Sequence, residues 1–172
     1  MISFKKYIED LFESRDKSYT VEWKNIGEDL IGYFSGDKEK YRILFINKPF
    51  DCFLIKFQVL SNGEWSFRGG KNNNIIDTFS VFGTLEKELD KFIDDRNPEY
   101  LIFFSLEPGS RNSIYLRYCN NVVEKFKDYN YEEISIQNKK CFFVFKEKLT
   151  EDEYKILIDS LREENYNYDE FD

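Results

Sequence analysis

The stretch EYLIFFSLEPGSRNSIYLRYCNN, residues 99–121, joins an almost continuous apolar run to a segment with helical spacing. Residues 99–106 are apolar nearly throughout, which is typical of a central strand covered on both faces. Pro108 and Gly109 predict a turn, and Ser110 is a residue type favoured at a helix start. Apolar residues then recur every three or four positions, as on the buried side of a helix. The stretch therefore predicts a buried strand, a tight turn and a capped helix.

Around this stretch, the sequence predicts an antiparallel meander and a later hairpin. The strands are indicated by short runs that alternate or are rich in aromatic and branched residues. Such runs occupy residues 19–23, 29–35, 40–47, 52–60 and 65–68, and the later hairpin occupies residues 131–137 and 140–147. Asn62 and Gly63 tolerate the positive φ angles of a tight turn, so they predict a hairpin that leads into residues 65–68.

Helical spacing of apolar residues recurs on both sides of the meander. The first such segment covers residues 4–12. A second helix is predicted to begin at a cap, Asp77 or Thr78, and to run to Asp94. The order of elements predicts an α+β fold, in which the meander continues into a mixed sheet with helices packed on it. We expect one domain over residues 1–147.

The last predicted helix lies in an acidic appendage, residues 148–172. Thr150 and Glu153 have the spacing of a capping box, which marks its start. Ile156, Leu157 and Leu161 are predicted to face inward.

The composition excludes several kinds of site. The chain has no histidine, which excludes Ser-His-Asp and Cys-His nucleophilic sites and argues against a zinc site. Its three cysteines, Cys52, Cys119 and Cys141, are isolated in the sequence, which indicates a reduced protein inside a cell. No apolar run approaches the roughly 18 residues that a membrane span needs. We therefore expect a cytoplasmic protein with no metal and no membrane contact.

Charge is distributed unevenly along the chain. The formal net charge is −8, and residues 147–172 contribute −7 through ten acids and three bases. This argues against broad binding of nucleic-acid phosphates by that end. Two interpretations stay open: a solvated terminal helix and tail, or an acidic surface that binds a partner protein. The candidate surface residues are Glu151, Asp152, Asp159, Glu163 and Glu164.

Four polar residues are candidates for a ligand site between strands and helices. Lys71 lies in a Gly-rich loop before the second helix, and Ser105, Ser110 and Arg111 lie between the central strand and the next helix. The carboxyl ends of strands and the N-termini of helices favour anionic ligands. The four residues therefore predict a site for a small ligand such as a nucleotide. A purely structural joint, with Ser110 as the helix cap, is the simpler interpretation and is favoured.

Part of the sequence resembles a family of small uncharacterised proteins of tailed bacteriophages. The resemblance covers residues 19–147 and follows the pattern V-F-x-T, N-P, F-S and S-R-x-x-[LI]-Y. The matching residues are Val81, Phe82, Thr84, Asn97, Pro98, Phe104, Ser105, Ser110, Arg111, Ile114, Tyr115 and Arg117. The resemblance implies a phage or prophage origin.

The order of elements also resembles that of the GNAT superfamily of N-acetyltransferases. Ser113-Ile114-Tyr115 looks like a motif of that family, whose tyrosine protonates the departing coenzyme A thiolate. The family's pyrophosphate loop, Q/R-x-x-G-x-G/A, is not matched by RGGKNNNIIDTFS, residues 68–80. The resemblance therefore implies a degenerate GNAT-like fold, with acetyl-CoA as a cofactor only in an alternative interpretation.

These observations favour a non-enzymatic phage accessory protein that acts by binding. The expected partner is a host protein, such as a defence or regulatory factor that an anti-defence inhibitor would target. One alternative is a GNAT-type acyltransferase that uses Tyr115 and acetyl-CoA. The other is a protein that sequesters a small nucleotide near Lys71, Ser105, Ser110 and Arg111.

Overall fold

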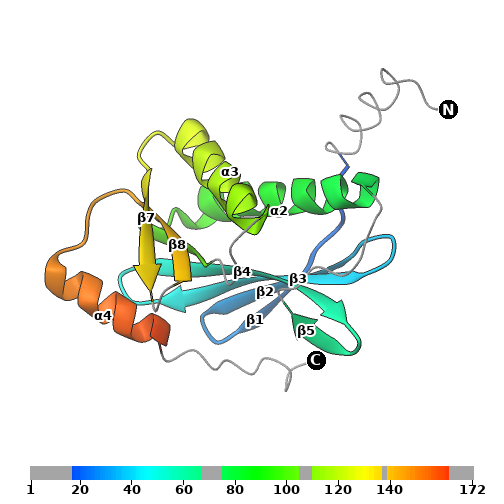
Figure 1. Cartoon of the computed structure of the whole chain (residues 1–172), viewed down its shortest axis with the longest axis horizontal. Helices are drawn as coiled ribbons and strands as arrows, with labels where there is room; N and C mark the ends of the chain where they lie inside the picture. The colour runs from blue at the N-terminus through cyan, green and yellow to red at the C-terminus, as the bar shows by residue number, and fades with distance from the viewer. Residues whose placement is uncertain (1–16, 67–74, 105–109, 137–138, 163–172) are drawn as a thin grey trace.

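The fold is α+β, with one large mixed sheet and helices on both of its faces (Figure 1). The computed structural model describes residues 17–66, 75–104, 110–136 and 139–162. The predicted helix over residues 4–12 therefore lies outside the described residues.

Within the described residues, the sheet contains eight strands. They are β1 (Glu22–Ile26), β2 (Asp29–Ser35), β3 (Lys40–Lys48), β4 (Cys52–Ser61), β5 (Glu64–Ser66), β6 (Tyr100–Phe104), β7 (Asn130–Ile136) and β8 (Lys139–Phe145). The strand order is β1-β2-β3-β4-β6-β8-β7, and β5 pairs with the end of β4. β4 and β6 are parallel, whereas the other pairs among the described strands are antiparallel. The sheet is therefore a meander that continues into a mixed sheet, as predicted.

Two helices cover one face of this sheet. α2 (Ile75–Arg96) connects the β4–β5 hairpin to β6, and α3 (Ser110–Lys125) connects β6 to β7. Both lie above the sheet in Figure 1. Phe92 of α2 stacks on Phe45 of β3 with ring centroids 4.1 Å apart, and Val122 of α3 is fully buried in the same cluster. Burial of these large apolar side chains supplies the main stabilisation of the face.

A third helix, α4 (Glu151–Arg162), covers part of the opposite face. Leu157 has no exposed surface and packs with Ile46 and Leu54 of the sheet. The predicted capping box is present, since the Thr150 amide donates to Glu153 Oε2 (2.9 Å) and the Glu153 amide donates to Thr150 Oγ1 (3.3 Å). Hydrogen bonds from Thr150 lower the pKa of the Glu153 carboxyl.

A buried lysine ties α4 to the sheet. Lys48, at the end of β3, is 6% exposed, and its Nζ donates to the backbone carbonyl of Ser160 at 3.2 Å. This carbonyl belongs to the last turn of α4, where a positive charge is favourable for the helix dipole.

Three sequence predictions need correction. The first strand is Glu22–Ile26 rather than 19–23, because the Tyr19 amide donates to Thr84 Oγ1 on α2 (2.8 Å) instead of to a neighbouring strand. The second helix begins at Ile75, before the predicted caps Asp77 and Thr78.

The third correction concerns Ile156, which is 53% exposed although it was predicted to face inward. Leu157 and Leu161 are buried, as predicted. These two are four positions apart and share one side of α4, and each residue turns by 100° in a helix. Ile156 therefore points away from the sheet.

Candidate functional site

The structure describes only part of the ligand site predicted from the sequence. Ser110 and Arg111 are the first two residues of α3, in the connection that follows β6. Lys71 and Ser105 lie outside the described residues. The binding of a small anion by these four residues therefore stays a prediction.

Tyr115, the catalytic residue of the acyltransferase alternative, lies in the core. It is 7% exposed, and its ring centroid is 5.9 Å from that of Phe103 on β6. This position suits a packing role. Most of the loop that the alternative also requires lies outside the described residues. Binding of acetyl-CoA stays a prediction, which calorimetry can test.

The acidic surface predicted on the last helix is present in part. Glu151, Asp152 and Asp159 are exposed on α4. Glu163 and Glu164 lie outside the described residues. Asp152, Ile156 and Asp159 have i, i+4 and i+7 spacing, so they share one side of the helix.

The cysteines do not offer a reactive nucleophile. Cys52, Cys119 and Cys141 are all buried. Burial raises the pKa of the Cys119 and Cys141 thiols to about 12 and raises the pKa of the Cys52 thiol further. Because the thiolate is the nucleophilic form, these side chains act as small apolar residues near neutral pH.

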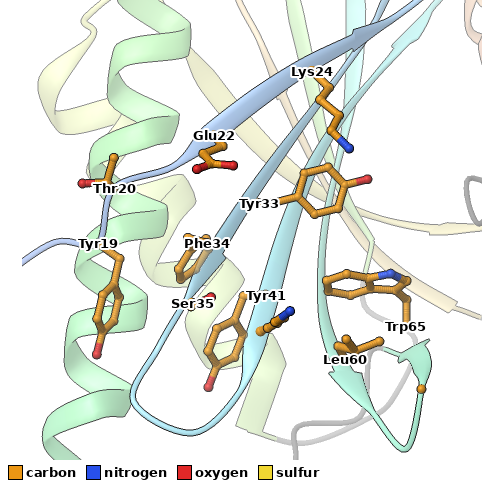
Figure 2. A pocket seen from close by; sticks show the side chains of 12 residues that line it. Tyr19, Thr20, Glu22, Lys24, Tyr33, Phe34, Ser35, Tyr41, Leu60 and Trp65 are labelled. Atoms are coloured by element: carbon orange, nitrogen blue, oxygen red, sulfur yellow. The ribbon is translucent and has the colours of Figure 1, made fainter. Parts of the chain in front are cut away.

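A different group of side chains lines an open trough of about 840 Å³ at the free end of the meander (Figure 2). It is formed by the segment before β1, by β1, β2 and β3, and by the β4–β5 hairpin. Figure 2 shows Tyr33 close to Trp65, with Tyr19 and Tyr41 on the opposite side of the strands, toward α2.

The strand register places two rows of residues beside this trough, on the face that α4 shares. Residues that pair across strands project to the same face of a sheet. One row is Glu22, Tyr33, Arg42 and Gln58, and the next is Ser35, Lys40, Leu60 and Trp65. We call these two rows the open half of the face. The covered half is the buried apolar cluster beneath α4, which includes Leu44, Ile46, Leu54 and Ile102.

Cations and aromatic rings alternate across the open half and the row beside it, in which Lys24 pairs with Ile31. The Nζ atom of Lys24 lies 4.9 Å from the ring centroid of Tyr33. The Tyr33 and Trp65 rings meet edge to face, with centroids 5.9 Å apart and planes at 61°. The Cζ atom of Arg42 lies 4.6 Å from the Trp65 ring centroid. Each contact has the geometry of a favourable aromatic or cation–π interaction.

The guanidinium group of Arg42 is held rigidly against the ring of Trp65. Arg42 is only 4% exposed, and its Nε donates to Gln58 Oε1 at 2.6 Å. Planar guanidinium groups stack well on aromatic faces. The indole is therefore held in place by the sheet, which reduces the entropy lost when a ligand stacks on it.

A second group of rings lies on the opposite face of the sheet, in and beside the apolar cluster covered by α2 and α3. Phe34 stacks between Tyr19 and Tyr41, with centroid distances of 6.0 Å and 5.2 Å. The hydroxyl groups are oriented by acids of the β2–β3 turn, since Tyr19 donates to Asp37 Oδ1 at 3.4 Å and Tyr41 donates to Glu39 Oε2 at 3.1 Å. These bonds hold the rings in fixed orientations.

Charged side chains of both signs reach the trough from exposed positions. Lys24 and Lys40 contribute ammonium groups, and Glu22 contributes a carboxylate. Aromatic faces with nearby cations suit ligands that combine a flat ring system with negative charge. The arrangement can therefore stack a planar group and pair with an anion attached to it.

Sequence reasoning located the hairpin but missed the trough. Asn62 and Gly63 adopt the predicted positive φ angles, 54° and 81°, and the turn fixes the pairing of Trp65 with Leu60. The alternation along β2 and β3 then decides that Tyr33 and Arg42 share the face of Trp65. The sequence did contain a signal for the position of Trp65. A tight turn fixes the register of the residues that follow it, and the register decides on which face of the sheet a side chain lies.

No helix in the described ranges has the length and apolar character needed to cross a membrane. Within the same ranges, no group of three or more Cys, Asp or Glu side chains is arranged to hold a metal ion.

Comparisons of this chain with protein families, with curated proteins and with solved structures gave no match.

Proposed function

We propose that this chain is a binding protein for ligands of the nucleotide class, and that the trough is its site. The observation that carries the proposal is the alternation of Lys24, Tyr33, Trp65 and Arg42. A nucleotide combines a flat aromatic base with a phosphate. This is the combination that rings interleaved with cations recognise.

The energetics favour the rings as the main source of affinity. Stacking of one base on an aromatic side chain contributes about 1–3 kcal/mol. Exposed ion pairs with Lys24 or Lys40 contribute about 0–1 kcal/mol each. Such a site gives modest affinity for one nucleotide, and loss of Trp65 removes most of it.

A titration followed by tryptophan fluorescence tests this proposal. The chain has two tryptophans, so Trp23→Phe leaves Trp65 as the only reporter. Adding AMP, GMP, UMP or CMP should quench its emission in a saturable way, because the base stacks on the indole. Inorganic phosphate is the control and should not quench. Absence of quenching by every nucleotide at millimolar concentration contradicts the proposal.

A matched pair of variants separates the site from the rest of the protein. In the chain with both tryptophans, Trp65→Leu should abolish the rise in melting temperature that a nucleotide gives. Trp23→Phe should keep that rise, because Trp23 faces α2 and donates to Glu88 Oε2 at 3.1 Å. Equal rises in both variants would place the site elsewhere.

A second candidate function is recognition of a basic protein surface by α4. The observation that favours it is Ile156, which is 53% exposed between Asp152 and Asp159 on one side of the helix. An exposed apolar side chain flanked by charges suits a protein contact. This candidate corresponds to the host-protein partner expected from the sequence.

Its test compares the wild type with the triple variant Asp152→Lys, Ile156→Asp, Asp159→Lys. All three positions are exposed, so the fold should persist. A basic host protein that the wild type retains in a pulldown should be lost with the variant, and the purified pair should then show the same difference. Equal retention by both proteins rules out α4 as the contact surface.

A further inference from the structure

We infer that β1 is the interface of a symmetric dimer, in which β1 of one copy pairs antiparallel with β1 of a second copy. The two sheets then join edge to edge. This inference goes beyond the nucleotide site, and its tests measure the mass of the particle rather than nucleotide binding. It is carried by the accessible edge of β1, by the packing of Trp23 and by the order of charges along the strand.

The outer edge of β1 has no partner among the described strands, because β1 stands at one end of the strand order and pairs only with β2. At the turn between the two strands, Ile26 pairs with Asp29 across two residues, of which Gly27 has a φ of 63°. A glycine with positive φ at the first position is typical of a tight two-residue hairpin, which a hydrogen-bonded pair closes. Ile26 therefore bonds to β2.

The turn decides which backbone groups of β1 face outward. Hydrogen-bonded and non-bonded pairs alternate along antiparallel strands. Counting back from Ile26, Lys24 and Glu22 also bond to β2. The backbone N–H and C=O groups of Trp23 and Asn25 consequently point away from β2. They are available to a further strand, which is the usual way in which an exposed sheet edge gains a partner.

The side chain of Trp23 leaves this edge accessible. Trp23 pairs with Gly32 on β2, where a Cβ atom would lie only 2.9 Å from the indole. The glycine therefore lets the indole cross β2 and stack on Phe45 of β3, with centroids 5.4 Å apart. The indole N–H donates to Glu88 of α2. Because the ring leans toward the middle of the sheet, it does not shield the outer backbone of β1.

The charges of β1 complement those of a second copy. Glu22 and Lys24 are exposed and flank Trp23. In a two-fold symmetric pair centred on Trp23, Glu22 of each copy lies directly opposite Lys24 of the other. These are non-hydrogen-bonded pairs, in which side chains are closest. A dimer centred on Glu22 or on Lys24 would instead place like charges opposite each other, which is destabilising. The charges therefore select one register.

The other end of the sheet lacks this property. β7 carries Glu132 and Glu133 side by side near its middle. Antiparallel pairing of β7 with its own copy, centred on either residue, would place two glutamates opposite each other. Charged residues on edge strands commonly prevent such association. Lys24 would have the same effect on β1 if Glu22 did not supply its partner. β1 is therefore the edge that suits a second copy.

Sedimentation velocity of the full chain tests the inference. Measurements from about 1 μM to about 1 mM cover the dissociation constants expected of a small interface. We expect the weight-average mass to rise with concentration from the 20.8 kDa of one chain toward that of two. A mass that stays at one chain over the whole range contradicts the inference.

Charge reversal tests the register. Glu22→Lys and Lys24→Glu each turn both opposite-charge pairs into like-charge pairs, so each should raise the Kd of the dimer about tenfold or more. An equimolar mixture of the two variants should dimerise again, because every lysine of one then faces a glutamate of the other. The double variant, with the two charges exchanged, should dimerise alone. If neither the mixture nor the double variant recovers the dimer, the register is wrong and the inference is overturned.

Two further variants test which edge is used. Asn25→Pro removes an outward N–H group but none of the bonds to β2, and proline is tolerated at such edge positions. It should weaken the dimer, and circular dichroism checks that the variant is folded. Glu133→Lys, at an exposed position of β7, is the matched control and should leave the Kd unchanged. If Glu133→Lys weakens the dimer as much as Glu22→Lys does, β7 contributes to the interface and the inference is wrong. If Asn25→Pro does not fold, the mixture of charge-reversed variants still decides.

Discussion

The covered half and the open half of one sheet face share β2, β3 and β4 but carry different side chains. Along β3, Lys40 and Arg42 belong to the open half, and Leu44 and Ile46 to the covered half. All four point to the same face, because they alternate along one strand. The change from charged to apolar residues coincides with the edge of the cluster beneath α4. Along this one strand, the apolar residues of the covered half stabilise the fold, and the charged residues belong to the half that we propose for recognition.

The two halves differ in how far their side chains are excluded from water. The covered half is held by apolar side chains that are almost fully excluded from water. In the open half, Arg42 is buried but its neighbours Tyr33 and Trp65 are only partly buried. Rings that remain accessible contribute less to the free energy of unfolding and are available to a ligand.

The strongest test of this division is a pair of neighbouring substitutions on α4. Leu157→Ala removes a fully buried side chain and should lower the free energy of unfolding by about 2–5 kcal/mol. Ile156→Ala, at a position that is 53% exposed, should change it by less than about 0.5 kcal/mol. Urea denaturation measures both. Similar losses from the two variants would mean that α4 does not pack as described.

Lys48 and Lys40, at opposite ends of β3, give the next comparison. Lys48→Met removes the hydrogen bond to the Ser160 carbonyl and should cost about 1–2 kcal/mol of stability. Lys40→Met acts at an exposed position and should cost less than about 0.5 kcal/mol. Thermal denaturation of the two variants checks this difference. An equal effect would show that the bond to α4 has no role in holding the helix.

Tyr33→Leu tests the claim that the open half serves recognition more than stability. The variant loses the edge-to-face contact with Trp65 and the contact with Lys24, so we expect a cost of about 1 kcal/mol or less. Quenching of Trp65 by UMP should weaken several-fold in the same variant. A large loss of stability with unchanged quenching would show that Tyr33 serves the stability of the fold and not recognition.

The smallest expected effect concerns the capping box of α4. The pKa of Glu153 is lower in the folded state than its ordinary value of 4.5, so its carboxylate stabilises the fold above that pH. This contribution is lost as the pH falls below 4.5 through the folded-state pKa. Glu153→Gln should therefore be slightly less stable than the wild type at pH 7, and the difference should shrink in acid. Urea midpoints at several pH values measure it, and a difference independent of pH contradicts the assignment.

Most of the fold could be predicted from local patterns. The strands 29–35, 40–47 and 52–60 were predicted from alternation and branched residues, and the structure places β2, β3 and β4 there. Prediction of the first strand failed because Tyr19 bonds to Thr84, a contact between residues 65 positions apart. Such a tertiary hydrogen bond leaves no local signal in the sequence.

The candidate site was harder to predict than the fold. Trp65 was assigned to a strand, but its neighbours Tyr33 and Arg42 are 32 and 23 positions away in the sequence. They meet it only through the registers of three strand pairs, β2–β3, β3–β4 and β4–β5. Sequence reasoning instead selected Ser110 and Arg111, because helix starts have a recognisable pattern. Sites assembled across strands need the register, which alternation alone does not give.

The most direct test of the recognition role is an NMR titration that follows the two indole N–H signals. Trp65 lies in the trough, whereas Trp23 lies over the opposite face with its N–H bonded to Glu88. We expect UMP to shift the Trp65 signal progressively while the Trp23 signal stays in place. If the Trp65 signal does not move, or if only the Trp23 signal moves, the trough is not the binding site.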